Sequence, residues 1–181
     1  MSAGLAGPAP LGTLAAFLLF VVAQRLAELA LSARNARRLL ARGAREYGRE
    51  HFPFLVILHT LFPIALVSEV VCLGARPGPL TFAWLALWAG AQLLRYAAVR
   101  ALGERWNVRV LVLPGAELVR HGPYRWLRHP NYLAVLVESV SGPMMFGAWR
   151  TALAFLIANL IVLRVRIRCE ERALTQAVRP A

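Results

Sequence analysis

Residues 52–73 read FPFLVILHTLFPIALVSEVVCL, an almost unbroken apolar run. A helix that crosses a lipid bilayer needs about 20 predominantly apolar residues, and this run is long enough. Two further apolar runs of similar length occupy residues 11–31 and 80–99. The three runs together predict an all-α integral membrane protein.

Two shorter apolar runs follow, at residues 131–146 and 151–163, on either side of Gly147. Each is short for a spanning helix, so we expect them to recruit flanking residues and form a tight helical hairpin. The sequence then predicts about five transmembrane helices. The alternative is four spans, with one of the short runs lying in the membrane interface.

The composition supports the membrane assignment. The chain carries a formal net charge of +12 while 59% of its residues are hydrophobic. A nucleic-acid-binding protein could be equally basic, but it would not contain several long apolar runs, so we expect no nucleic-acid partner. The chain has neither Lys nor Asp. This excludes a Schiff-base lysine, a phosphate-loop lysine and an aspartate-containing catalytic triad.

The distribution of arginine predicts the orientation in the membrane. Arginines concentrate in residues 34–49, 100–128 and 164–179, whereas the two intervening turns hold one each, Arg76 and Arg150. Basic loops remain on the cytoplasmic side. We therefore expect a multi-pass protein of the cell membrane with its N-terminus outside and its C-terminus in the cytoplasm.

The length predicts a single domain covering residues 1–181. Its N-terminal part, residues 1–100, would contain three helices. Its C-terminal part, residues 101–181, would contain a polar connector, the helical hairpin and a basic tail.

The most informative polar segment is residues 118–138, LVRHGPYRWLRHPNYLAVLVE. Residues 122–123, Gly-Pro, predict a turn, and Pro130 suits the first position of a helix. The free amides of that helix start, with Arg125 and Arg128 nearby, would form a site for a carboxylate or phosphate. The alternative is a capped helix whose arginines contact lipid headgroups.

Glu138 lies two helical turns inside the apolar run that follows this segment. An ionisable side chain within a membrane costs about 2.5–3.5 kcal/mol or more and by default marks a functional site. The alternative is a protonated glutamate packed against another helix.

A second polar cluster ends the last apolar run. Helical spacing places Arg164, Arg168 and Glu171 on one face of a helix. Arg166 and Glu170 lie on another face. An interfacial ion-pair network is the alternative reading of this cluster.

Several polar residues also occur near or within the predicted spans of the N-terminal half, and we expect a water-filled space or a substrate path lined by them: Glu28, Asn35, Glu46, His51, His59 and Glu69. The eight-residue separation of His51 and His59 could suit a haem or a metal. No other histidine lies in any span to complete such a site, so we expect no metal.

Three motifs resemble the signature of the isoprenylcysteine carboxyl methyltransferase family of membrane enzymes. They are Gly-Pro-Tyr at 122–124, Arg-His-Pro-Asn-Tyr at 128–132 and Glu-Glu at 170–171. The upstream polar pattern resembles a bacterial subgroup associated with type III polyketide synthases; its residues are Glu28, Leu29, Ser32, Arg34, Asn35, Gly43, Ala44, Glu46, His51 and His59.

The resemblance implies that S-adenosylmethionine binds at the cytoplasmic ends of the last helices. The residues that it implies for this cofactor are Arg128, His129, Pro130, Tyr132, Glu170 and Glu171. It also implies a lipophilic small-molecule acceptor that enters from among the membrane lipids. The subgroup implies an alkylpyrone or alkylresorcinol as acceptor, and a functional link to a type III polyketide synthase.

The predicted reaction is transfer of a methyl group from the sulfonium to an oxygen atom of the acceptor. A phenol or enol would benefit from a general base, and Glu138 and His59 are the candidate catalytic residues. Three alternatives remain open. They are methylation of an isoprenylcysteine carboxylate or of a small amine lipid, a non-catalytic membrane protein and a transporter.

Overall fold

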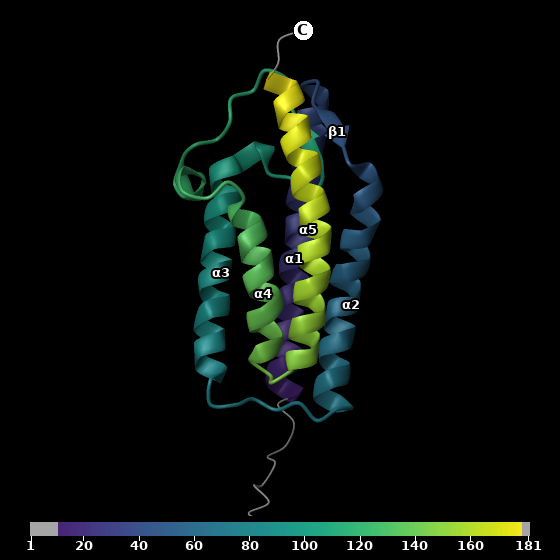
Figure 1. Ribbon diagram of the computed structural model, residues 1–181, viewed down its shortest axis with the longest axis vertical. Coiled ribbons are helices and arrows are strands. Elements are labelled where there is room, and N and C mark those ends of the chain that lie inside the picture. The colour runs from purple at the N-terminus through teal and green to yellow at the C-terminus, as the bar shows by residue number, and fades with distance from the viewer. Residues whose placement is uncertain (1–10, 179–181) are drawn as a thin grey trace, which may run out of the picture.

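The computed structural model describes residues 11–178, which form an elongated bundle of five α-helices (Figure 1). The helices are α1 (Leu11–Ala41), α2 (Phe52–Val71), α3 (Thr81–Leu102), α4 (Pro130–Met144) and α5 (Trp149–Val178). Three short 3-10 helices, Arg49–His51, Gly103–Arg105 and Gly122–Arg125, lie in the connections. Helices α3, α4 and α5 pack against one another in sequence, and α2 packs on α5.

Helix α1 is longer than the apolar run that predicted it. The run ends at residue 31, but the helix continues through the basic stretch to Ala41. Residues 32–41 contain no Gly or Pro, so nothing in the backbone ends the helix earlier. The chain turns at Gly43, whose φ of 88° is in the left-handed region that favours glycine.

Two of the five helices, α1 and α2, are long and apolar enough on their own to cross a membrane. Helix α3 is long enough but buries Gln92 and Arg95, which lower its hydropathy. Helix α4 has 15 residues, which corresponds to about 22 Å of helix. Five spans are therefore a prediction that helix length and composition alone do not establish.

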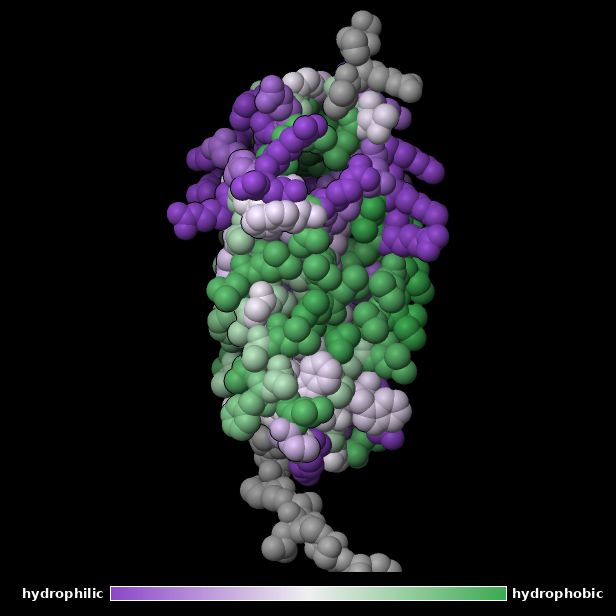
Figure 2. All heavy atoms as spheres, turned by 60° about the vertical axis from the view of Figure 1, so that its left-hand side comes forward, coloured by the Kyte–Doolittle hydropathy of each residue, from purple (hydrophilic) through white to green (hydrophobic). Residues whose placement is uncertain are grey.

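The surface supports a membrane location. Figure 2 shows a broad hydrophobic region across the middle of the visible face and a hydrophilic band towards the end where α5 terminates. Large apolar side chains of α1 and α3 are strongly exposed, including Leu19 at 71%, Phe82 at 81% and Leu93 at 71%. An exposed apolar area of this extent suits contact with lipid rather than with water.

A small antiparallel sheet was not predicted by the all-α assignment. Strand β1 (Arg45–Tyr47) pairs with β2 (Val110–Val112), with Arg45 opposite Val112 and Tyr47 opposite Val110. Val110 and Val112 form a buried cluster with Ala173 of α5. Each strand has only three residues, too few for the sequence to display a strand pattern. The sheet joins the two predicted parts of the chain at the hydrophilic end.

Side chains of α1 hold the connector that precedes α4. Ser32 accepts a hydrogen bond from the Val108 amide at 3.1 Å, and the Asn107 side-chain amide donates to the Ser32 carbonyl oxygen at 2.9 Å. Asn35 is buried and donates to the carbonyl oxygens of Gly103 at 3.1 Å and Trp106 at 2.8 Å. These bonds fix the start of the connector against the first helix.

The opposite end of the bundle is closed by different contacts. The buried carboxylate of Glu69, on α2, accepts hydrogen bonds from the backbone amides of Arg150 at 3.0 Å and Thr151 at 2.6 Å. It therefore caps the N-terminus of α5. Gly147 has a φ of 72°, and a Cβ there would lie 2.0 Å from the Arg76 carbonyl oxygen. Only glycine fits this turn.

Candidate active site

The predicted cofactor residues converge where α4 begins and α5 approaches its end. Arg128 and His129 complete the connector, and Pro130 is the first residue of α4. Tyr132 lies in the first turn of α4, so it faces the same end of the bundle. The Glu-Glu pair at 170–171 belongs to α5. Two segments that are separate in sequence, residues 128–132 and the Glu-Glu pair, therefore meet at one place.

Tyr132 lies at the centre of this cluster. Its hydroxyl donates a hydrogen bond to the carboxylate of Glu170 and accepts one from Arg166 Nε at 2.9 Å. The Arg166 guanidinium also lies over the tyrosine ring, 5.7 Å from its centroid. Arg166 and Glu170, which helical spacing placed on one face of the helix, thus both act on Tyr132.

Glu171 occupies a more open position in the same cluster. Its carboxylate lies 3.5 Å from Arg128 Nη1 and 3.4 Å from His129 Nε2. The exposed fraction of the side chain is 87% for Arg128, 43% for Glu171 and 19% for His129. His129 stacks on Tyr132 with ring centroids 5.3 Å apart. Arg128 and Glu171 are therefore accessible to a ligand.

An open groove of about 410 Å³ adjoins this part of α5. Its lining residues are Arg168, Glu171, Arg172, Thr175 and Gln176. The groove therefore combines two guanidinium groups with one carboxylate and two neutral polar groups. Such a set can bind a ligand that carries both signs of charge.

Tyr124, in the 3-10 helix before α4, borders this cluster. Burial, followed by the nearby negative charge of Glu170, raises the pKa of Tyr124 well above its usual range. Its hydroxyl therefore stays protonated at neutral pH and remains able to donate a hydrogen bond.

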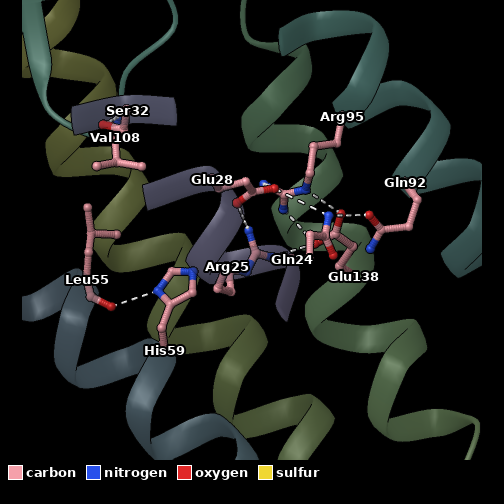
Figure 3. A network of polar contacts seen from close by, with 10 residues as sticks. All are labelled: Gln24, Arg25, Glu28, Ser32, Leu55, His59, Gln92, Arg95, Val108 and Glu138. Carbon is pink, nitrogen blue, oxygen red and sulfur yellow. Dashed lines mark hydrogen bonds and ion pairs between the residues drawn. The ribbon is translucent and has the colours of Figure 1, made fainter. Parts of the chain in front are cut away.

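A second polar cluster lies deeper in the bundle, among the apolar surfaces (Figure 3). The Glu138 carboxylate binds Arg95 through two hydrogen bonds, from Nε at 2.7 Å and Nη2 at 2.5 Å. Arg25 donates to the same carboxylate at 3.0 Å and to Glu28 at 2.6 Å. Two arginines and two glutamates from three helices therefore balance one another.

The two predicted catalytic residues line the same cavity beside this cluster. Glu138 and His59 both border a cavity of about 70 Å³ that is otherwise mainly apolar. His59 Nδ1 donates a hydrogen bond to the Leu55 carbonyl oxygen at 2.7 Å. Figure 3 shows the His59 ring on the opposite side of Arg25 from Glu138. The two residues thus share a cavity without a direct contact.

Sequence reasoning missed the partners of Glu138. It treated residues 80–99 as a plain apolar run and overlooked Arg95, whose side chain is 2% exposed. A signal was present, because an arginine and a glutamate in separate apolar runs are expected to pair inside a membrane. The alternative of a protonated Glu138 against a neighbouring helix does not match its two arginine partners.

Part of the upstream polar pattern has a structural explanation. Ser32 and Asn35 anchor the connector, and Glu46, in β1, lies 3.4 Å from Arg109. These three residues therefore join the two halves of the chain rather than line a substrate path. The side chain of His51 lies outside the described part of the structure.

Comparisons with known proteins agree with this arrangement of motifs. The family model for isoprenylcysteine carboxyl methyltransferase (ICMT) matches residues 84–176, which run from α3 to the end of α5. The uncharacterized protein YpbQ of Bacillus subtilis is 38% identical over 156 residues, covering 86% of this chain and 93% of that protein. An uncharacterized protein of Haemophilus influenzae is 30% identical over 156 residues, covering 86% of this chain and 91% of its own length. The chain belongs to the isoprenylcysteine carboxyl methyltransferase family.

Proposed function

We propose that the protein is an integral membrane O-methyltransferase that uses S-adenosylmethionine and acts on a lipophilic acceptor. The observation that carries the proposal is the convergence of the 128–132 motif with Glu170 and Glu171 at one end of the bundle. Both segments lie within the residues that the family model matches. The nearby arginines, Arg128, Arg168 and Arg172, support a site for a charged ligand.

The chemistry of the cluster fits the proposed cofactor. S-adenosylmethionine carries a carboxylate, an ammonium group and ribose hydroxyls, and when bound it supplies an electrophilic methyl group. Arg128 and the arginines of the groove can pair with the carboxylate. Glu171 can bind the ammonium group or the ribose hydroxyls.

The two glutamates take different roles in this proposal. Glu170 is engaged with the Tyr132 hydroxyl, so it orients the first turn of α4. Glu171 is 43% exposed and faces the groove, so it is the better candidate for direct contact with the cofactor. His129 and Pro130 set the position of the helix start rather than provide the main charge.

For the acceptor we propose a ring hydroxyl on a single-chain lipid, such as an alkylpyrone or alkylresorcinol. The cavity with His59 at its border, which is mainly apolar, supports a small polar head attached to an apolar tail. A functional link to a type III polyketide synthase, which makes such lipids, follows from the same proposal. An isoprenylcysteine carboxylate is the second candidate, because the family is named for that activity.

His59 is the better candidate for a general base. Its Nδ1 is used as a donor to Leu55, which leaves Nε2 of the neutral ring free to accept a proton. The Glu138 oxygens, in contrast, already accept hydrogen bonds from Arg95 and Arg25, so they are engaged with these arginines rather than available to an acceptor. Glu138 would then act as a positioning residue.

The test is a labelled-methyl assay with purified protein in detergent. An alkylpyrone, an alkylresorcinol and a farnesylated cysteine derivative compete in one reaction, and mass spectrometry identifies the product. We expect label in a hydroxyl-bearing lipid. Label in the farnesylated compound alone would contradict the proposed acceptor but support a methyltransferase that acts on isoprenylcysteine. The absence of transfer to any of the three compounds would contradict the proposal as a whole.

We further propose five membrane spans, with the site at the cytoplasmic face and the N-terminus outside. The arginines at the ends of α1 and α5 and in the connector support this orientation. In a chain without its native cysteines, Pro77→Cys should react with a membrane-impermeant maleimide in intact cells. Glu104→Cys should react only after the membrane is opened. Equal labelling of both positions would refute the orientation.

A further inference from the structure

The cavity beside Glu138 receives side chains from all five helices. Aromatic and aliphatic groups form most of its wall, including Phe17, Phe62, Trp88 and Phe155. Its polar wall is formed by Gln24, Arg25, His59, Gln92, Glu138, Ser139 and Asn159. The surface of this wall is mainly apolar and carries several polar groups, which is typical of a site for a small molecule.

Two buried oxygen atoms of this wall have no hydrogen-bond partner. They are Gln24 Oε1 and Asn159 Oδ1, and their residues are 8% and 5% exposed. Among the described residues, the buried side-chain atoms without a partner are all amide oxygens, and the other two, on Asn35 and Asn131, lie away from this cavity. A buried acceptor without a partner is unfavourable, so each such atom needs an explanation.

The donors of the same two amides are already used. Gln24 Nε2 donates to Gln92 Oε1 at 2.7 Å, with a longer contact to Glu28 at 3.3 Å. Asn159 Nδ2 donates to the Phe155 carbonyl oxygen at 2.9 Å. These bonds also fix which end of each amide is the oxygen. The two unpaired atoms of this wall are therefore acceptors, and an occupant that satisfies them must bring donors.

The surroundings indicate how such an occupant would enter. Helices α1 and α2 both border the cavity. Their outward apolar side chains are exposed, as for Val22 at 45% and Leu61 at 49%. An alkyl chain could lie in this apolar region while its polar head reaches the cavity.

We propose that this cavity anchors the hydroxyl head of a single-chain lipid, with Gln24 and Asn159 accepting hydrogen bonds from its hydroxyl groups. The enclosed volume of about 70 Å³ suits the hydroxyl-bearing edge of a ring, because a cavity of about 150 Å³ is needed to enclose a whole benzene. This assignment rests on the proposed function, since it names the residues that would select a hydroxylated acceptor.

The experiment measures binding without any cofactor, so it is independent of methyl transfer. Pentadecylresorcinol and its dimethyl ether are titrated into the detergent-purified protein, and the fluorescence of the tryptophans, among them Trp88 in the cavity wall, is followed. The two probes share a shape and a tail, but the ether has no hydroxyl donor. We expect the resorcinol to bind at least tenfold more tightly.

Asn159→Leu should abolish this preference without lowering the stability of the unliganded protein. The change removes an unpaired acceptor, and the Phe155 carbonyl that loses a donor belongs to the same helix. Ser141→Ala is the matched control, because Ser141 is buried in α4 but does not line the cavity. Asn159→Ala provides a smaller replacement should Asn159→Leu fail to fold.

Equal binding of the two probes to the native protein would overturn the assignment, as would a preference that persists in both Asn159 variants. The proposed function is judged separately by the labelled-methyl assay. Methyl transfer that does not depend on Asn159 would contradict only the proposed hydroxyl-binding site in the cavity, which we call the anchor site. A preference for the resorcinol that Asn159→Leu abolishes, without transfer to any hydroxylated lipid, would confirm the anchor site and contradict the acceptor.

Discussion

The two charged clusters of the protein are built from the same residue types but differ in how completely their charges are paired. In the interior cluster, Glu138 is 8% exposed and has two arginine partners at 3.0 Å or less. In the cluster where α4 begins and α5 approaches its end, Glu171 is 43% exposed and its contacts are 3.4 and 3.5 Å long. One cluster is nearly saturated by the protein, and the other has capacity for a ligand.

This difference separates structure from binding. Charges buried in an apolar environment are tolerated only when paired and hydrogen-bonded, so removing one partner is costly. Charges at the surface are weakly paired and contribute little to stability, but they remain available to a charged ligand. We therefore expect substitutions in the interior cluster to act on folding and substitutions in the exposed cluster to act on cofactor affinity.

The largest effect should come from Glu138→Leu. It leaves the guanidinium of Arg95 buried without its main partner, which should lower the free energy of unfolding by about 3–5 kcal/mol. Denaturant unfolding in a fixed detergent measures this loss. Glu104→Gln is the control, because Glu104 pairs with Arg38 while both side chains are about half exposed. Equal stability of the two variants would remove the distinction between the clusters.

A double variant sharpens the same test. Arg95→Leu combined with Glu138→Leu removes both charges of the main pair, so it should be more stable than Glu138→Leu alone. The interaction energy from the double-mutant cycle reports the pairing itself. Additive losses would mean that the two residues act independently.

Next in size is the effect on cofactor affinity. Arg128→Ala and Glu171→Ala should each weaken binding of S-adenosylmethionine by about 1.5–3 kcal/mol, the usual range for hydrogen bonds to charged groups. Titration calorimetry measures this change. Their free energy of unfolding should stay within about 1 kcal/mol of the native value, since both groups are substantially exposed. Native affinity in both folded variants would refute the cofactor assignment.

The smallest effect is expected for Tyr132→Phe. The variant keeps the ring that stacks on His129 but removes the hydroxyl between Arg166 and Glu170. Loss of these hydrogen bonds should destabilise the protein by about 1 kcal/mol and weaken cofactor binding less than Glu171→Ala does. Thermal unfolding with and without cofactor measures both. A larger loss of affinity than in Glu171→Ala would reverse the roles assigned to the two glutamates.

The motifs predicted much of the exposed cluster. Local sequence indicated that Pro130 begins a helix and that Glu170 and Glu171 lie on the next helix of a hairpin, and the structure has this arrangement. A Pro at the first helical position and apolar runs on both sides of Gly147 are local signals. The extent of α1 and the strands β1 and β2 were missed, because three-residue strands and a basic helix extension leave little pattern.

The sequence by itself determined the helical class, the apolar character of the surface and the segments that carry the family motifs, because these depend on neighbouring residues in the chain. The tertiary structure decided which charges meet. Arg25, Arg95 and Glu138 are far apart in sequence and become a balanced cluster only when α1, α3 and α4 pack together. The same packing placed Gln24 and Asn159 in the wall of a cavity and left their side-chain oxygens without partners. Hydrogen-bond pairing inside a membrane is a property of helix packing, and no local pattern specifies it.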